Sequence, residues 1–269
     1  MPYLSPALNV MTTAARKAGR RLIRDFGEVE NLQISRKGPA DFVSNADERT
    51  ERILVEELSK ARPGYSFLVE EQGLIEGPDK SHRFIIDPLD GTTNFLHGIP
   101  HFAISIALER DGQLTSAVVY NPVTDEMYTA ERGHGAYLND KRLRVAGRSA
   151  LQEAVIATGI PFLGREGHEI FLTELARLMA ATAGVRRFGA ASLDLAYVAA
   201  GRVDGFWEFG LSPWDTAAGT LLIQEAGGRV GTPAGEEYAL GPNIIAGNPR
   251  VYQGLLEAIG PLTPAALRA

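Results

Sequence analysis

The spacing of apolar residues changes twice along the chain, and these changes constrain the possible folds more than any other feature. From Leu4 to Phe26, apolar residues recur every three or four positions, which predicts an amphipathic helix. Between residues 102 and 145, short alternating runs separated by turn-forming pairs predict an antiparallel meander. After residue 155, strand-like and helix-like runs alternate, so the chain as a whole predicts mixed sheets layered with helices.

Turn and cap signals give approximate limits for the other elements. A second helix is expected to begin near Ser44 and to end before Pro63, and a strand is expected at residues 65–69. The apolar run at residues 84–86 is too short for a helix, and we interpret it as a strand that ends in Asp87. Further helices are predicted at residues 168–181, 192–200, 213–226 and 250–259.

The size of the chain allows a substantial core. It has 269 residues, of which 45% are hydrophobic, and this suits one large domain or two closely packed halves. No internal repeat, low-complexity block or flexible linker interrupts the sequence. We therefore expect an α+β half at residues 1–148 and an α/β half at residues 149–269, packed as one structural unit of the mixed α/β class.

The residue content excludes several classes of function. Lysine and arginine total 27 against 33 acidic residues, so the net charge of −6 supports neither a nucleic acid nor a membrane surface as partner. The lack of cysteine excludes disulfides and thiolate nucleophiles. Neither a long apolar run nor a secretory signal stands out, and we expect a cytoplasmic protein. The basic residues between Arg16 and Arg24 fit a surface helix better than a transit peptide.

The segment at residues 87–94, DPLDGTTN, carries the densest functional signal. Asp87 and Asp90 flank a proline turn that can aim both carboxylates at one point, where a hard cation such as Mg²⁺ would offset their repulsion. If a helix starts here, the N–H groups of Gly91 and Thr92 would face an anion. A turn with solvated aspartates is the alternative. The combination of carboxylates and N–H groups favours phosphoryl transfer.

Four further acidic residues lie at comparable places in the predicted elements. Glu70 and Glu71 follow the strand at residues 65–69, Asp47 lies in the first turn of the second helix, and Asp215 lies at the third position of another. Taken singly, Asp47 and Asp215 fit helix capping better than metal binding. Their spacing alone leaves both interpretations open.

Motifs for competing chemistries are missing or incomplete. The chain has no Gly-x-Ser-x-Gly elbow, no Walker lysine loop and no Asp-x-Asp pair. His97 and His101 are four residues apart, but Gly98 and Pro100 prevent a regular helix that would present both to zinc. The common covalent phosphatase mechanisms are therefore not expected.

Two segments together resemble the signature motifs of the inositol monophosphatase family. They are DPLDGTTNF at residues 87–95 and WDTAAG at residues 214–219, in the order in which the family has them. The similarity extends over nearly the whole chain and is closest to bacterial members. It implies a layered α-β-α-β-α sandwich that is commonly assembled as a homodimer.

The same resemblance implies two Mg²⁺ ions, and a third held more weakly beside Glu70. Glu70, Asp87 and the backbone carbonyl of Leu89 would hold the first ion. Asp87, Asp90 and Asp215 would hold the second, so Asp87 would bridge the two. Li⁺ is expected to inhibit because it can replace Mg²⁺ at one of these positions. The implied reaction is direct hydrolysis by an activated water, without a phosphoenzyme.

Catalytic and substrate-binding roles follow from the resemblance in the same way. Thr92, supported by Asp47, would orient the attacking water, and Glu70 completes the catalytic set. The phosphate would meet the N–H groups of Gly91 and Thr92. The residues implied to contact the hydroxyl groups of the substrate are Asp90, Ala191, Glu208 and Asp215.

The implied substrate is a small phosphorylated polyol, myo-inositol 1-phosphate. The alternatives with the same metal site are fructose 1,6-bisphosphate, histidinol phosphate and phosphoadenosine phosphate. The discrimination between these esters is expected to depend on Glu208, Ala191, Ser212 and the loop at residues 159–165. An alternative of another class is a non-catalytic regulatory binding protein on the same fold, against which the intact acidic residues argue.

Overall fold

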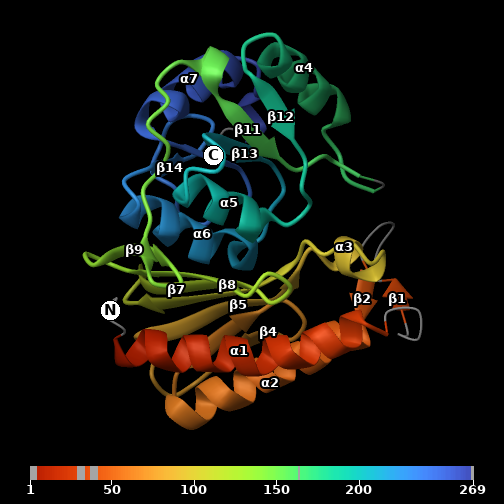
Figure 1. Cartoon of the computed structure of the whole chain (residues 1–269), viewed down its shortest axis with the longest axis vertical. Coiled ribbons are helices and arrows are strands. Elements are labelled where there is room, and N and C mark those ends of the chain that lie inside the picture. Colours follow the sequence, from red (N-terminus) through yellow and green to blue (C-terminus); the bar gives the residue numbers. More distant parts are fainter. Residues whose placement is uncertain (1–4, 29–33, 37–41, 163, 268–269) are drawn as a thin grey trace.

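The protein consists of five layers, in which three pairs of helices enclose two β-sheets (Figure 1). The computed structural model describes residues 5–28, 34–36, 42–162 and 164–267, so Leu4 of the first predicted helix lies outside the described residues. The α-helices are α1 (Pro6–Phe26), α2 (Asn45–Ala61), α3 (Thr92–Leu96), α4 (His168–Met179), α5 (Ala191–Ala199), α6 (Pro213–Glu225) and α7 (Pro249–Ile259).

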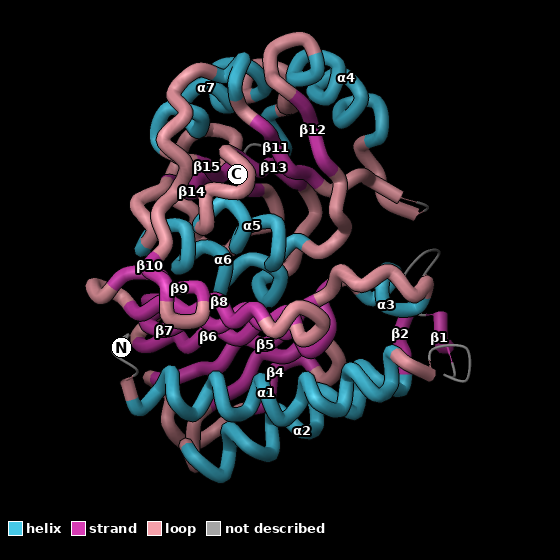
Figure 2. The backbone as a smooth tube through the Cα atoms, viewed as in Figure 1, coloured by secondary structure: helices cyan, strands magenta, loops and turns pink. Residues whose placement is uncertain are grey.

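Helices α1 and α2 form the first layer. The side chain of Ser5 caps α1 by accepting a hydrogen bond from the N–H of Leu8, and Pro6 occupies the first helical position. The apolar face of α1 is buried as predicted, with Met11 and Leu22 fully enclosed. Both helices pack on one face of the larger sheet (Figures 1 and 2).

The larger sheet has eight strands in the order β10-β9-β8-β7-β6-β5-β3-β4. From β5 to β10 every neighbouring pair is antiparallel, which confirms the predicted meander, whereas β3 and β5 are parallel. The strands are β3 (Ser66–Val69), β4 (Gly73–Ile75), β5 (His82–Asp90), β6 (Ala103–Arg110), β7 (Gln113–Asn121), β8 (Glu126–Glu131), β9 (Gly135–Leu138) and β10 (Lys141–Arg142).

Strand β5 is longer than the sequence pattern predicts. It continues through Pro88 to Asp90, and its pairing with β6 shifts register between Asp87 and Asp90. Proline cannot donate to a ladder of hydrogen bonds, but it is tolerated where a bulge interrupts the pairing. The irregular stretch keeps both aspartates at the end of one strand, directly before α3.

The smaller sheet has five strands in the order β12-β11-β13-β15-β14, with parallel and antiparallel pairs. Helices α4 and α7 cover its outer face (Figure 1). Its strands are β11 (Val155–Thr158), β12 (Gly184–Arg186), β13 (Gly205–Glu208), β14 (Arg229–Gly231) and β15 (Ile244–Gly247). Two short strands, β1 (Ile34–Arg36) and β2 (Phe42–Ser44), form a separate hairpin, and the 3₁₀ turns are η2 (Leu151–Glu153) and η3 (Ala265–Leu267).

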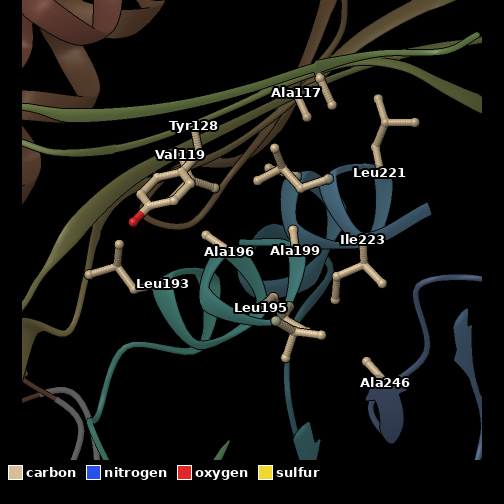
Figure 3. Close-up of a cluster of buried hydrophobic side chains, with 14 of the residues drawn as sticks. Ala117, Val119, Tyr128, Leu193, Leu195, Ala196, Ala199, Leu221, Ile223 and Ala246 are labelled. Carbon is tan, nitrogen blue, oxygen red and sulfur yellow. The ribbon is translucent and has the colours of Figure 1, made fainter. Parts of the chain in front are cut away.

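Helices α5 and α6 form the middle layer and contribute to a hydrophobic core that reaches both sheets (Figure 3). The core includes Val119 from the larger sheet, Leu195 and Leu221 from the helices, and Ala246 from the smaller sheet. The helices approach closely because Gly219 has no Cβ, which would overlap the side chain of Leu195. This close packing of α5 against α6 therefore sets the positions of both helices relative to the end of β5.

The layered α-β-α-β-α architecture confirms the expected fold class. The four helices predicted in the second half of the chain are present, with ends that differ by at most two residues. The division at residue 148 into two halves stays a prediction. Among the described residues, no helix is both long and apolar enough to cross a membrane.

Replacement of Leu221 by alanine tests the importance of the middle layer. Leu221 is fully buried between the sheets, so Leu221→Ala should lower the free energy of unfolding by about 2–5 kcal/mol. Leu172→Ala is the matched control, because Leu172 is 60% exposed on α4 and its loss should change stability by less than about 0.5 kcal/mol. Chemical denaturation of both variants measures the difference, and equal values would contradict the packing described.

Candidate active site

The predicted site residues come together where several elements begin or end. Asp87 and Asp90 lie in the last part of β5, and Thr92 is the first residue of α3. Asp47 lies in the first turn of α2, and Asp215 lies in the first turn of α6. Glu70 follows the last residue of β3. The site thus draws on both halves of the chain.

The acidic residues form two clusters that could each hold a metal ion. In one, carboxylate oxygens of Asp87, Asp90 and Asp215 all lie within 4.8 Å of one another. In the other, the same limit holds for Asp47, Glu70 and Glu71. The first cluster brings together residues that are more than a hundred positions apart in the sequence.

Backbone and side-chain hydrogen bonds shape the turn between β5 and α3. Oδ1 of Asp87 accepts a hydrogen bond from the N–H of Leu89 at 2.9 Å. The hydroxyl of Thr92 lies 2.9 Å from the carbonyl oxygen of Leu89 and 3.4 Å from Oδ2 of Asp47. Thr92 and Asp47 are therefore neighbours, as the resemblance to the family implies. Gly91, which precedes α3, has a φ of 91°, a conformation that favours glycine.

Asp215 combines the two roles that the sequence left open. Its Oδ2 accepts a hydrogen bond from the N–H of Ser212 at 2.7 Å, and Pro213 is the first residue of α6. The same carboxylate belongs to the cluster with Asp87 and Asp90. Capping the helix thus fixes the position from which Asp215 reaches the cluster.

Asp90 is held by the middle layer of helices. Its Oδ2 accepts hydrogen bonds from the N–H of Ser192 at 2.7 Å and from the hydroxyl of Ser192 at 2.6 Å. Nearby, Nδ2 of Asn94 donates to the carbonyl oxygens of His101 and Phe188. Reasoning from the sequence missed Ser192, which there marked only the start of a predicted helix. No local pattern could have shown that it meets Asp90.

Glu51 was missed as part of the site, and Glu71 was singled out in the sequence but was given no role. Oε2 of Glu51 accepts a hydrogen bond from the N–H of Glu71, and Oε1 accepts one from Nε2 of Gln72, both at 2.8 Å. Glu51 thereby ties the turn after β3 to α2, and Glu71 joins the cluster of Asp47 and Glu70. The only signal in the sequence was that Glu70 and Glu71 are adjacent.

Burial and mutual repulsion shift the ionisation of the clustered acids. Burial, with added repulsion from Glu70, Asp90 and Asp215, raises the pKa of Asp87 well above its usual range. Burial also raises the pKa of Asp90 and of Asp215, although hydrogen bonds from Ser192 and Ser212 partly oppose these increases. A bound cation would favour the charged forms and reverse the shifts.

A cavity of about 170 Å³ opens beside the acidic cluster. Burial and the neighbouring Asp215 and Asp90 raise the pKa of Glu208 to about 8. All six predicted substrate-binding residues line this cavity: Asp90, Gly91, Thr92, Ala191, Glu208 and Asp215. The lining also includes Gly159, Phe162, Arg165, Arg187, Gly189 and Asp194. The loop at residues 159–165, which was expected to influence substrate choice, contributes to this wall, although position 163 lies outside the described residues.

Comparison with known proteins identifies the group to which the chain belongs. The model of the inositol monophosphatase family matches residues 4–262. The chain belongs to the inositol monophosphatase family. It is 61% identical to an inositol-1-monophosphatase of Mesorhizobium japonicum over 95% of this chain and 96% of the relative.

Other relatives of this inositol monophosphatase family member carry different names. The chain is 47% identical to a Nus factor SuhB of Pseudomonas aeruginosa, over 98% of this chain and the whole of the relative. A crystal structure of extragenic suppressor protein suhB from Bartonella henselae superposes with a TM-score of 0.93 at 57% identity, covering 95% of this chain and 98% of that one. The family resemblance and the expectation of a phosphatase are both confirmed.

The chemistry of the clustered groups fits a hard metal ion. The candidate ligands are carboxylate oxygens and the carbonyl oxygen of Leu89, and the chain contains no cysteine. Oxygen ligands select Mg²⁺, Mn²⁺ or Ca²⁺ over softer metals. Converging, partly buried carboxylates are also unfavourable unless a cation or protons neutralise them.

Divalent cations should therefore stabilise the protein. At a Mg²⁺ concentration of 100 times the dissociation constant, the free energy of unfolding should rise by about 2.7 kcal/mol for one site. Asp87→Asn removes the carboxylate of the first cluster that is most buried and should largely abolish this increase. Asp140→Asn, at an exposed acid, is the matched control and should keep it. Thermal unfolding with and without Mg²⁺ measures the effect, and an unchanged response of Asp87→Asn would contradict the site.

Proposed function

We propose that the protein is a Mg²⁺-dependent phosphomonoesterase that hydrolyses myo-inositol 1-phosphate to inositol and phosphate. The observation that carries this proposal is the meeting of Asp87, Asp90 and Asp215 beside a cavity that also contains Thr92 and Glu208. The name of the relative from Mesorhizobium japonicum supports the choice of substrate. This arrangement supports a metal-dependent reaction on a phosphorylated polyol.

The metal ligands proposed here are those that the family resemblance implies. Glu70, Asp87 and the carbonyl of Leu89 would hold one Mg²⁺, and Asp87, Asp90 and Asp215 would hold another. The cluster of Asp47, Glu70 and Glu71 supports a place for a third ion beside Glu70. When bound, the ions would lower the pKa of a water molecule and offset charge on the phosphate.

Thr92 and Asp47 are proposed to orient the attacking water. The hydroxyl of Thr92 already lies near Oδ2 of Asp47 and the carbonyl oxygen of Leu89, so its rotation is restricted. A hydroxyl fixed in this way can accept a hydrogen bond from water and hold it for attack on phosphorus. Glu70 is the third catalytic residue of the proposal. The N–H groups of Gly91 and Thr92 are proposed to receive the phosphate oxygens.

The alcohol part of the substrate is proposed to bind on the side of the cavity formed by Asp90, Ala191, Glu208 and Asp215. Carboxylates that accept hydrogen bonds from hydroxyl groups suit a polyol. Arg165 and Arg187 line the same cavity and partly offset the charge of Glu208. The charged side chains of this cavity thus suit the binding of a small, strongly hydrated alcohol.

A panel of phosphate esters separates this proposal from the alternatives. Purified protein with Mg²⁺ is expected to release phosphate from myo-inositol 1-phosphate with a higher kcat/KM than from fructose 1,6-bisphosphate, histidinol phosphate or phosphoadenosine phosphate. A higher value for one of these esters would replace the proposed substrate. No Mg²⁺-dependent release from any of them would favour a binding role, as the name Nus factor SuhB of some relatives suggests. Li⁺ should inhibit the reaction.

A homodimer in the cytoplasm completes the proposal. Leu172 and Met179 lie seven residues apart on α4 and are 60% and 65% exposed, so they share an uncovered apolar face. Met179 also borders a groove with Ile160, whose side chain is 43% exposed. Exposed apolar surface of this kind is typical of protein interfaces. Sedimentation equilibrium tests this assembly, and a monomer at all concentrations would exclude it.

Removal of the proposed catalytic groups should abolish turnover without unfolding the protein. We expect Asp87→Asn to reduce kcat for myo-inositol 1-phosphate on the order of 10³-fold, because Asp87 is shared by both proposed metal sites. Thr92→Ala should reduce kcat by about 10²-fold or more through loss of the oriented water. Steady-state phosphate release measures both effects.

Two substitutions at exposed positions serve as matched controls. Asp140→Asn and Thr13→Ala change the same residue types away from the site and should retain wild-type kcat. Near-normal turnover by Asp87→Asn would refute the proposed site. Near-normal turnover by Thr92→Ala would remove only the proposed role of its hydroxyl.

A further inference from the structure

Asp194 is a buried carboxylate in the wall of the candidate substrate cavity. It is the fourth residue of α5 and is only 1% exposed. The cavity that it lines also contains Asp90, Ala191 and Glu208. Neither cluster of possible metal ligands found among the described residues includes Asp194, so it has no assigned role.

The hydrogen bonding of Asp194 is incomplete. Its Oδ1 is buried and has no hydrogen-bond partner in the part of the chain that the structure describes. Burial raises the pKa of Asp194 well above its usual range, with added repulsion from Glu208 and Asp90. A buried polar atom without a partner destabilises a fold and is uncommon unless a ligand or water completes it.

Asp204 shows how the same protein treats a carboxylate that is purely structural. It is also fully buried, but Oδ1 accepts a hydrogen bond from Nε of Arg148 at 2.7 Å and Oδ2 accepts one from the N–H of Val155 at 2.9 Å. Asp204 therefore links elements through satisfied hydrogen bonds, whereas Asp194 leaves an acceptor beside the cavity. The contrast points to a ligand for Asp194.

Glu208 provides another acceptor in the cavity, packed against Gly159. Its carboxylate occupies the space that a side chain at Gly159 would fill, because a Cβ built there would overlap Oε1, Oε2 and Cδ of Glu208. Glu208 and Asp194 line the same cavity of about 170 Å³, so both can face one ligand. Two acceptors in one small cavity require a ligand with several hydrogen-bond donors.

The charges around the cavity limit what this ligand can be. Arg165 and Arg187 line it as well, and both lower the pKa of Glu208 through their positive charge. These guanidinium groups already supply positive charge beside Glu208, and neutral hydroxyl groups can donate hydrogen bonds to the carboxylates without adding charge.

We propose that Asp194 is an additional hydroxyl-binding carboxylate, which acts with Glu208, apart from the proposed metal ligands Asp90 and Asp215, to select phosphate monoesters whose alcohol carries at least two free hydroxyl groups. This inference rests on the proposed phosphatase function and narrows its substrate class. Asp194 is a specificity residue in this scheme, and it takes no part in the attack on phosphorus.

The variant Asp194→Asn tests the proposal with two substrates. With myo-inositol 1-phosphate, KM should rise about 10- to 100-fold while kcat changes little, because the amide that replaces the carboxyl group is a weaker acceptor in both the ground and transition states. With 4-nitrophenyl phosphate, whose alcohol part has no further hydroxyl group, kcat/KM should change by less than about twofold. Equal losses with both substrates, or no loss with either, would overturn the proposal.

A substrate series on the wild-type protein keeps the test valid if the variant does not fold. The series is cyclohexyl phosphate, trans-2-hydroxycyclohexyl phosphate and myo-inositol 1-phosphate. Two acceptors predict that kcat/KM rises at both steps, by about tenfold each. If kcat/KM rises only at the first step, the remaining hydroxyl groups contribute nothing, and this result would contradict an additional hydroxyl-binding carboxylate.

Gly159→Ala examines the other carboxylate of the pair. The new methyl group must displace Glu208. Gly159→Ala should therefore weaken the binding of myo-inositol 1-phosphate selectively, as is expected of Asp194→Asn. The double variant shows whether the two carboxylates act separately. If each single variant raises KM for myo-inositol 1-phosphate but the double variant raises it no further, Asp194 does not act as a separate acceptor, and the proposal fails.

Failure of the proposed function has a different signature. If wild-type protein hydrolyses none of the phosphate esters with Mg²⁺, the phosphatase proposal is wrong. The affinities of wild type and Asp194→Asn for myo-inositol, measured by calorimetry with Mg²⁺ and inorganic phosphate present, then decide the role of Asp194. Weaker binding by the variant supports a hydroxyl-binding carboxylate, and equal or absent binding overturns it.

Discussion

Repulsion among carboxylates is the constraint on which the rest of the site depends. Asp87, Asp90 and Asp215 lie within 4.8 Å of one another, in surroundings that raise the pKa of each. The fold opposes this repulsion with hydrogen bonds from Leu89, Ser192 and Ser212. These bonds hold the oxygens in place before any cation binds, so the protein is organised in advance to receive one.

The middle layer of helices makes this arrangement possible. Ser192 near the start of α5 contacts Asp90, and the start of α6 carries Asp215. Small residues bring α5 and α6 close together, and their apolar side chains join a core that includes both sheets (Figure 3). Side-chain packing far from the carboxylates therefore sets the distances between them.

The buried carboxylates of this protein divide by how fully they are hydrogen-bonded. Glu174 accepts hydrogen bonds from Nε1 of Trp207 and from the hydroxyl of Thr263, and burial raises its pKa to about 7. Asp204 is paired with Arg148. These two acids hold elements of the second half of the chain together. In contrast, Oδ1 of Asp194, in the wall of the cavity, has no hydrogen-bond partner among the described residues, which is the expected state of a group that meets a ligand.

Local sequence determined the elements and the principal acidic residues. Apolar spacing gave the helices and the meander, and the DPLDGTTN segment marked Asp87 and Asp90 because strand, turn and cap signals act over a few residues. The local sequence pattern did not show that β5 continues through Pro88. Only the tertiary structure could bring Ser192, Glu51 and Asp194 to the site, because their roles depend on packing between distant elements rather than on their neighbours in the chain.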